Sequence, residues 1–509
     1  MTKANAQKIV AASSEPPPIK LALATTRSID LASAMTRREH DLLGEADIPA
    51  DVYWGVHTLR SVENFPITGV PIGHFPELVR ALALVKQAAA RANRRLGHLS
   101  VAKAEAIDRA CDLIAKDRRF LDQFVVDAVQ GGAGTSTNMN ANEVVANLAL
   151  ELMGKSRGEY AALHPIDDVN MAQSTNDAYP TALRLAMIFG AKSLAQALQD
   201  LAFAFKAKAV EFGDVLKIGR TQLQDAVPMT LGQEFDAFHV TIKEDVDRLQ
   251  EAASLFREVN LGATAIGTGI NTDPRYASLA VAELARLSDE RMVLAENLIE
   301  ATSDMGAFVL FSGVLKRIAV KLSKICNDLR LLSSGPRAGF GEIRLPAVQA
   351  GSSIMPGKIN PVIPEAVSQV AYLVIGHDLT VTMCAEGGQL QLNAFEPTIG
   401  YCILTSLRML TAAIDTLTQR CVTGIEANRE RCRELVENSI GLVTVLGPIL
   451  GYETCSHVAR RALDEGRKVA DVILEEGLMT AAELHDLLGI EDMTRPTRLT
   501  SPVLAKLRR

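Results

Sequence analysis

The sequence predicts a mainly α-helical subunit of three domains, with a central bundle of five long helices that forms a multi-helix core together with other subunits. Two observations carry this prediction. Hydrophobic residues make up 48% of the 509 residues but aromatic residues only 5%, a composition that favours packed helices over a β-sandwich. Apolar residues also recur with helical spacing over five long stretches, at 181–212, 230–260, 296–333, 362–385 and 397–423.

Several of these stretches are apolar around most of their circumference. Examples are "LAMIFGAKSLAQALQDLAFAF" (185–205) and "AFVLFSGVLKRIAVKL" (307–322). A helix of this kind must be buried on several sides in a soluble protein. We therefore expect a bundle whose apolar faces continue into other subunits of a closed, symmetric assembly.

The chain divides into four regions by composition and periodicity. Residues 1–34 are rich in small residues, are interrupted by Pro16-Pro17-Pro18 and lack a helical or strand period, so we expect a disordered N-terminal extension. The predicted domains are an N-terminal domain at 35–174, a central helical-bundle domain at 175–429 and a small, more charged C-terminal domain at 430–509. In the first of these domains we expect helices at 77–96, at 101–116 and near 140–153.

Composition also excludes several classes of partner. A formal charge of −7 offers no electrostatic case for nucleic acid or an anionic membrane, and no charge-free apolar run is long enough to span a bilayer. The seven cysteines form no CxxC pair, which argues against a disulfide framework or a zinc site and fits a reducing cytoplasm. We assign no metal ligands.

Four polar loops lie beside the long helices. Each residue alone is an ordinary turn or cap residue, but together the loops offer many neutral donors and one cation, which suits a small substrate with carboxylates. Their polar residues are Thr135, Ser136 and Asn138; Ser174, Thr175 and Asn176; Thr221 and Gln222; and Ser352, Ser353, Lys358 and Asn360.

Other loop chemistries do not fit. In "AGSSIMPGKINPV" (350–362) the spacing of Gly351 and Gly357 and the Ile359 after Lys358 differ from a phosphate-binding P-loop. The glycines near 131–134 do not follow a predicted strand, so they make no dinucleotide fingerprint. The sequence contains no HExxH motif and no Ala-Ser-Gly tripeptide that could form an electrophilic ring.

The polar loops resemble those of the aspartase/class II fumarase superfamily. "GSSIMPGKINP" resembles its signature segment, and "GGAGTSTNMNANE", "QSTNDAYP" and "GRTQLQDAVPMTLGQEF" resemble its other shared regions. The similarity runs from about residue 38 to 490. Segments such as "EVNLGATAIGTG" and "TVTMCAEGGQLQLNAFEP" are most similar to the aspartate ammonia-lyase branch.

The resemblance implies the reversible removal of ammonia from L-aspartate to give fumarate, through a doubly charged aci-carboxylate. It makes Ser352 the general base, acting as an alkoxide on a flexible lid loop. It places Lys358, Asn360 and Thr221 at the substrate α-carboxylate, and Asn176 and Gln222 at the amino group. The β-carboxylate, which gains charge, would be bound by Thr135, Ser174, Thr175 and Ser353.

The resemblance also implies a homotetramer in which three subunits build each active site. One subunit would give the 135 and 174–176 loops, a second 221–222 and a third 352–360. No cofactor is required for the chemistry, and family aspartases can respond to activating divalent cations such as Mg²⁺, for which we place no site.

Two alternatives stay open. A class II fumarate hydratase would share the fold, but fumarases, and some aspartases, have histidine where this chain has Gln222. A neutral glutamine cannot act as a general acid, and departure of ammonia from a protonated amine needs that acid less than loss of hydroxide does. A non-catalytic structural protein on the same fold is the second alternative, although every matched site position carries a plausible residue.

Overall fold

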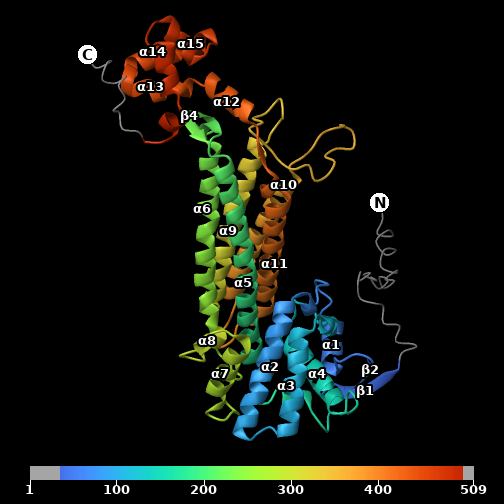
Figure 1. Ribbon diagram of the computed structural model, residues 1–509. Coiled ribbons are helices and arrows are strands. Elements are labelled where there is room, and N and C mark those ends of the chain that lie inside the picture. Colours follow the sequence, from blue (N-terminus) through green and yellow to red (C-terminus); the bar gives the residue numbers. More distant parts are fainter. Residues whose placement is uncertain (1–34, 497–509) are drawn as a thin grey trace, which may run out of the picture.

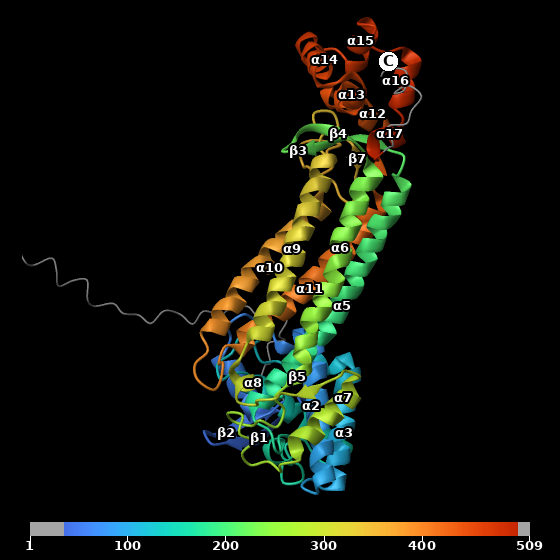
Figure 2. The same ribbon diagram turned by 90° about the vertical axis from the view of Figure 1, so that its left-hand side faces the viewer.

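The computed structural model describes residues 35–496, and the predicted N-terminal extension at 1–34 lies outside them. The subunit is elongated (Figure 1). A long helical bundle forms the middle, the N-terminal helices pack around one end of it, and the C-terminal helices sit at the other end. The perpendicular view in Figure 2 shows the same three layers along the rod.

The predicted bundle of five long helices is confirmed. In the bundle α5 packs on α6 and α11, while α10 packs on α9 and α11. Consecutive bundle helices run in opposite directions, whereas α5 and α11 run in the same direction. The bundle helices are α5 (Thr175–Glu211), α6 (Leu231–Ser254), α9 (Gly306–Leu332), α10 (Val362–Glu386) and α11 (Glu396–Arg420). Helix α11 is long and apolar enough to cross a membrane, but here its apolar residues pack inside the bundle.

Helix α5 begins earlier than the predicted start at 181. Pro180 signals a helix end in the sequence because it has no N–H to donate to the carbonyl of Asn176. In the structure the side chain of Asn260 donates a 3.0 Å hydrogen bond to that carbonyl instead. Ser174 and Asp177 form a capping box at the helix N-terminus, so residues 175–180 are helical rather than a loop.

The predicted helix at 296–333 is also divided. It consists of a short α8 (Glu300–Ser303) and the long α9, with Asp304 extended between them. The Asp304 carboxylate accepts the N–H of Gly306, the first residue of α9, so α9 begins as a separate helix. The stretch predicted at 230–260 ends its α-helix at Ser254 and continues as the 3-10 turn η4 (Leu255–Arg257).

The N-terminal end of the rod contains the predicted helices α2 (Pro76–Leu96) and α3 (Val101–Lys116). The third, α4 (Thr135–Leu152), starts five residues earlier than predicted because Gly134 supplies the left-handed N-cap. The remaining elements of this end are β1 (Thr36–Asp41), β2 (Gly44–Pro49), α1 (Val56–Asn64), η1 (Ile72–His74), η2 (Arg118–Gln123), η3 (Pro165–Val169), β5 (Glu258–Val259), α7 (Tyr276–Ser288) and β6 (Val293–Leu294).

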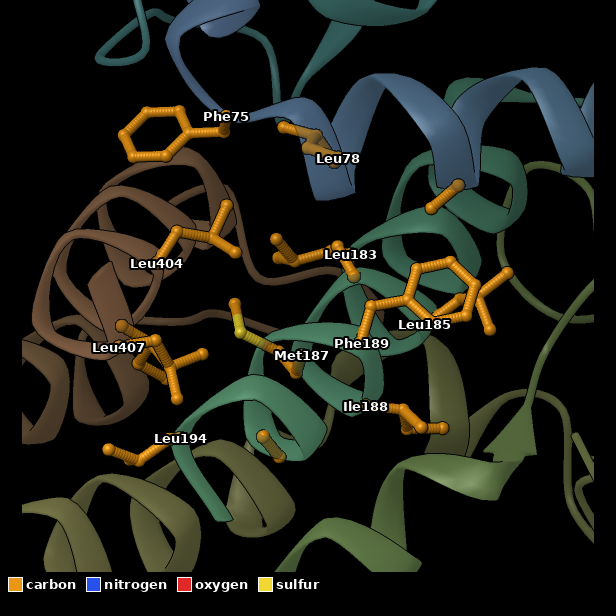
Figure 3. Packing of buried hydrophobic residues seen from close by; sticks show 14 of the residues in the cluster. Phe75, Leu78, Leu183, Leu185, Met187, Ile188, Phe189, Leu194, Leu404 and Leu407 are labelled. Atoms are coloured by element: carbon orange, nitrogen blue, oxygen red, sulfur yellow. The ribbon is translucent and has the colours of Figure 1, made fainter. Parts of the chain in front are cut away.

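One hydrophobic core joins this end to the bundle. Figure 3 shows Phe75 and Leu78, at the start of α2, above Leu183 and Met187 of α5, with Leu404 and Leu407 of α11 beside them. All six side chains are buried. This continuous packing fixes α2 and α4 against the first turns of α5, where two of the polar loops lie.

The opposite end of the bundle carries two small antiparallel sheets and the C-terminal helices. β3 (Leu216–Thr221) pairs with β4 (Gln224–Thr230), and β7 (Ile343–Arg344) pairs with β8 (Glu426–Ala427). The last helices bury a cluster of their own that includes Leu446, Val472 and Ile473. They are α12 (Arg429–Asn438), α13 (Val443–Leu450), α14 (Tyr452–Glu465), α15 (Val469–Glu475), α16 (Ala481–Leu487) and α17 (Ile490–Thr494), with η5 (Val422–Gly424) and η6 (Ile440–Leu442) between or before them.

Candidate active site

Two helix N-termini meet where α4 and α5 begin. Gly134 has φ +92°, and a Cβ there would lie 2.4 Å from the ring of Tyr179 on α5. Only glycine allows this close approach, which brings Thr135 on α4 next to Ser174 and Thr175 at the start of α5. Helix N-termini expose backbone N–H groups and carry partial positive charge, so their meeting point suits a carboxylate.

The hydroxyl groups of this cluster are held by local hydrogen bonds. The Ser174 hydroxyl oxygen accepts the N–H of Asn176 at 3.2 Å, and the Thr175 hydroxyl oxygen accepts the side-chain N–H of Asn138 at 3.2 Å. Since each hydroxyl accepts through its oxygen, its own hydrogen remains available for a ligand. Thr135 instead donates its hydroxyl hydrogen to the carbonyl of Gly132 at 2.6 Å.

Asn176 lies in the first turn of α5, beside this cluster. Its side-chain amide donates a 2.7 Å hydrogen bond to the carbonyl of Ala265. The neighbouring Asp177 carboxylate accepts the N–H groups of Ser174, Gly262 and Thr264, which ties the 260–265 loop to the start of α5. The geometry therefore brings Thr135, Ser174, Thr175 and Asn176 together at one end of the subunit.

Thr221 and Gln222 lie at the other end, at the tip of the β3–β4 hairpin. Thr221 pairs with Gln224, so Gln222 and Leu223 form a two-residue turn. Both have positive φ, +54° and +61°, as a type I′ turn requires. Asparagine and glycine are the usual residues there, so an exposed glutamine in this conformation is strained. Such strain is concentrated at functional sites.

Buried charges fix this hairpin to the strand that leads to the loop of Ser352. Glu342 is fully buried just before β7, and its carboxylate accepts from Arg220, next to Thr221, at 2.8 Å. The Lys217 ammonium lies 3.2 Å from the same carboxylate and 2.7 Å from Glu234. The hairpin tip and the start of the 345–361 segment thus share one rigid base.

The loop that carries Ser352, which is predicted to act as a lid, closes on a narrow neck. The N–H of Gly351 donates to the carbonyl of Lys358 at 3.0 Å, and the side chain of Asn360 donates to the carbonyl of Gly351 at 2.7 Å. A Cβ on Gly351 would lie 2.4 Å from the Lys358 oxygen, so the neck requires glycine. The loop between these residues projects from the bundle, as Figure 1 shows above α10.

Inside the loop, the side chain of Ser352 is fixed by two hydrogen bonds from the backbone. Its hydroxyl oxygen accepts the backbone N–H groups of Ile354 at 3.2 Å and Met355 at 3.0 Å. Ser353 and Lys358 are exposed, and within residues 35–496 the Lys358 ammonium has no acceptor. The loop therefore presents one hydroxyl with two N–H donors and one unpaired cation.

The polar residues predicted to form one site fall into two groups at opposite ends of α5. This helix has 37 residues and so spans about 55 Å. Thr135 and residues 174–176 lie at its N-terminal end, whereas the 221–222 hairpin and the 352–360 loop lie beyond its C-terminal end (Figures 1 and 2). One subunit does not bring the two groups together.

Lys86, which is not among the residues predicted from the sequence, lies directly behind the α4–α5 cluster. Its ammonium donates to Asn138 at 2.6 Å, and it is fully buried on α2. The sequence pattern that points to Lys86 is a single lysine within the apolar run "ALALVKQAAA". Among residues 35–496, no group of three or more His, Cys, Asp or Glu side chains could hold a metal ion.

Comparison with known proteins places this geometry in a family. Residues 44–376 match the family described as "Lyase", and residues 442–495 match "Fumarase C C-terminus". The chain is 62% identical to an aspartate ammonia-lyase of Pseudomonas canavaninivorans, over 91% of this chain and 98% of that protein. It is 55% identical to the aspartate ammonia-lyase of Escherichia coli (strain K12), over 90% of this chain and 96% of the other.

Solved structures agree. A fumarate lyase:delta crystallin from Brucella melitensis, bound to cobalt, superimposes with a TM-score of 0.88 at 60% identity, covering 91% of this chain and 100% of that one. A class II fumarase from Schistosoma mansoni gives a TM-score of 0.84 at 33% identity, covering 90% and 98%.

Fold and site together define a helical lyase, and the chain belongs to the aspartase/class II fumarase superfamily. Within that superfamily the curated relatives at 55–62% identity are aspartate ammonia-lyases, whereas the fumarase is only 33% identical. The predicted family, lyase class and aspartase branch are confirmed.

Proposed function

We propose that this protein converts L-aspartate to fumarate and ammonia, reversibly, with Ser352 as the base that removes the Cβ proton. The observation that carries this role is the pair of backbone N–H groups, of Ile354 and Met355, that point at the Ser352 hydroxyl oxygen. A serine hydroxyl is a very weak acid. Donors aimed at its oxygen favour the alkoxide, as they favour any anionic form.

The α4–α5 cluster supports binding of the β-carboxylate. Proton removal turns this group into a doubly charged aci-carboxylate, and stabilising that charge is the main demand on the catalyst. The free hydroxyl hydrogens of Ser174 and Thr175 and the N-termini of two helices suit this task, and Thr135 borders the same cluster. Ser353 would add a further hydroxyl from the lid.

The remaining polar groups would hold the other end of the substrate. Lys358, the unpaired cation of the lid, would bind the α-carboxylate together with Asn360 and Thr221. Asn176 and Gln222 would face the amino group. Because the protonated amine leaves as ammonia, a neutral glutamine at 222 is sufficient, and no general acid is required there.

Completing the site requires other subunits. The two groups of residues lie about 55 Å apart along α5, so the substrate must be enclosed by loops of different chains. The exposed side of α10 supports this assembly: Tyr372, Leu373, Leu379 and Met383 are each more than half exposed in the single chain. A closed homotetramer would bury this apolar surface and bring opposite ends of different bundles together.

The proposal also includes an activating metal ion and a cellular compartment. A divalent cation such as Mg²⁺ would act as an activator outside the chemical steps, and we assign it no ligands. We place the protein in the cytoplasm, where its free cysteines, six of the seven buried, stay reduced.

The experiment that tests the activity offers the purified protein L-aspartate and L-malate and follows fumarate by its ultraviolet absorbance. We expect rapid release of fumarate and ammonia from L-aspartate and little fumarate from L-malate. Faster turnover of L-malate would instead make the protein a hydratase. Turnover of neither substrate would favour a structural protein on this fold.

A further inference from the structure

Lys86 is the most completely buried cation near the candidate site. It lies on α2 among alanine, leucine and valine side chains, with no exposed surface. Its ammonium donates to three amide oxygens: Oδ1 of Asn138 at 2.6 Å, Oδ1 of Asn170 at 3.0 Å and Oε1 of Gln173 at 2.8 Å. No carboxylate of residues 35–496 forms an ion pair with it, so its charge is not neutralised by direct contact.

The three amides are oriented for a charged lysine. Each uses its own N–H groups on another oxygen: Asn138 donates to Asn170 and Thr175, Asn170 to the carbonyl of Gln173, and Gln173 to the carbonyl of Val169. Turning any amide over would break these bonds. All three therefore present oxygens to Lys86, and only an ammonium has three hydrogens for three acceptors.

Burial lowers the pKa of Lys86 to about 7. The titratable groups that face it are Asp177 on α5, whose charge favours the ammonium, and Cys111 on α3, whose thiol is itself buried. A dianion bound in front of the amides would favour the ammonium further. Burying a charged lysine without a carboxylate partner lowers the stability of the folded protein, so a lysine at this position calls for a functional reason.

From this geometry we infer that Lys86 is a positioning residue that supplies the positive charge missing from the β-carboxylate pocket. Asn138 transmits the effect: its Oδ1 accepts from Lys86 and its Nδ2 donates to the Thr175 hydroxyl. Lys86 thereby orients and polarises Thr175 and stabilises the aci-carboxylate more than the ground-state carboxylate. The inference rests on the proposed function.

The chemistry explains why such a charge is useful behind the pocket. The hydroxyls of Ser174 and Thr175 are neutral donors, adequate for a carboxylate with one negative charge. The intermediate doubles that charge. A fixed cation in a dry, low-dielectric interior interacts more strongly with the second charge than one in water would, and it needs no rearrangement as the charge develops.

The test compares two ligands rather than activity alone. Succinate stands in for the ground-state dicarboxylate. The aspartate analogue with a nitro group in place of the β-carboxylate, in its ionised nitronate form, has the planar, doubly bonded carbon of the aci-carboxylate and places two formally negative oxygens where its oxygens lie. Titration calorimetry measures both affinities for the full-length protein and its variants, alongside kcat and KM for L-aspartate.

Two variants test the positive charge of Lys86, one by removing it and the other by neutralising it. Lys86→Met deletes it, and Asn170→Asp places a carboxylate against it while keeping Lys86 bonded. We expect each to lower kcat and nitronate affinity about 10- to 100-fold, the range for residues that act through a ligand-contacting group, and to change succinate affinity less than about threefold. Asn170→Asp keeps the test decisive if Lys86→Met fails to fold.

Gln87→Met is the matched control. Gln87 is equally buried on the same helix, but its amide donates to the carbonyl of Asp108, away from Asn138. Its ratio of nitronate to succinate affinity should equal that of the wild type. If the wild type converts L-aspartate, two results would overturn the inference. One is an equal loss of affinity for both ligands in Lys86→Met and Asn170→Asp, and the other is no loss of affinity for either ligand. Absent wild-type turnover would overturn the proposed function and this inference with it.

Discussion

The side-chain amide of Asn260 donates a 3.0 Å hydrogen bond to the main-chain carbonyl of Asn176, the acceptor that Pro180 leaves without its helical partner. The same amide donates to the Thr302 hydroxyl at 3.0 Å. Two segments that are distant in sequence thus determine where α5 begins, and with it the placement of Ser174, Thr175 and Asn176.

Replacing Asn260 by alanine should loosen the first turn of α5. The carbonyl of Asn176 would be left without a donor in a partly buried place, a loss of about 1–3 kcal/mol. We expect a lower midpoint of thermal unfolding and a higher KM for L-aspartate. Gln196→Ala removes an exposed amide from the same helix, where its side chain donates to Asp200, and should change neither quantity. An unaltered KM in Asn260→Ala would show that the turn holds without this bond.

Ser352→Ala should lower kcat by several orders of magnitude and leave KM within a few-fold, because loss of the base removes a transition-state interaction. Ser353→Ala, next to it on the loop, should raise KM and lower kcat far less than Ser352→Ala does, because that hydroxyl would bind the β-carboxylate and is not the base. Steady-state kinetics separate the two effects. A near-normal kcat with a raised KM in Ser352→Ala would mean that Ser352 binds substrate and another group is the base.

Sharing of sites between subunits is tested by complementation. Ser352→Ala and Thr221→Ala variants, each nearly inactive, are unfolded together in equal amounts and reassembled. With random mixing, each of two loops from different chains is wild-type about half the time, so about a quarter of the sites should be intact. Activity near a quarter of wild type supports the shared site. Mixed tetramers with only parental activity would place both loops in one chain.

A buried carboxyl outside the candidate site should make stability depend on pH. Glu396 is buried at the start of α11, and neither of its oxygens has a hydrogen-bond partner within residues 35–496. Burial raises its pKa from 4.5 to about 8. Between these values the folded protein holds a proton that the unfolded chain releases, so this group's stabilisation is complete at low pH and is lost as the pH rises.

Glu396→Gln removes this titration and keeps the shape of the side chain. The variant should therefore be progressively more stable than the wild type from pH 5 to pH 8, as thermal unfolding at a series of pH values would show. Glu453→Gln, at an exposed position on α14, is the control and should show no such trend. A constant difference between Glu396→Gln and wild type across this range would mean that Glu396 is ionised in the folded protein.

The sequence by itself determined the helical class, the five bundle helices, the polar loops and the family. Helical periodicity depends on neighbours three and four residues away, and the loop motifs are local strings, so both can be read along the chain. The roles assigned to Ser352, Thr221 and the other loop residues came from the family resemblance, and they remain predictions.

Only the tertiary structure decided the features that depend on contacts between distant segments of the chain. The start of α5 required Asn260, the left-handed conformation of Gln222 required the pairing of β3 with β4, and the charge of Lys86 is explained only by Asn138, Asn170 and Gln173 around it. The separation of the polar loops along a rigid 37-residue helix is likewise a property of the fold. These features arise from contacts between segments far apart in the chain, which local sequence patterns do not encode.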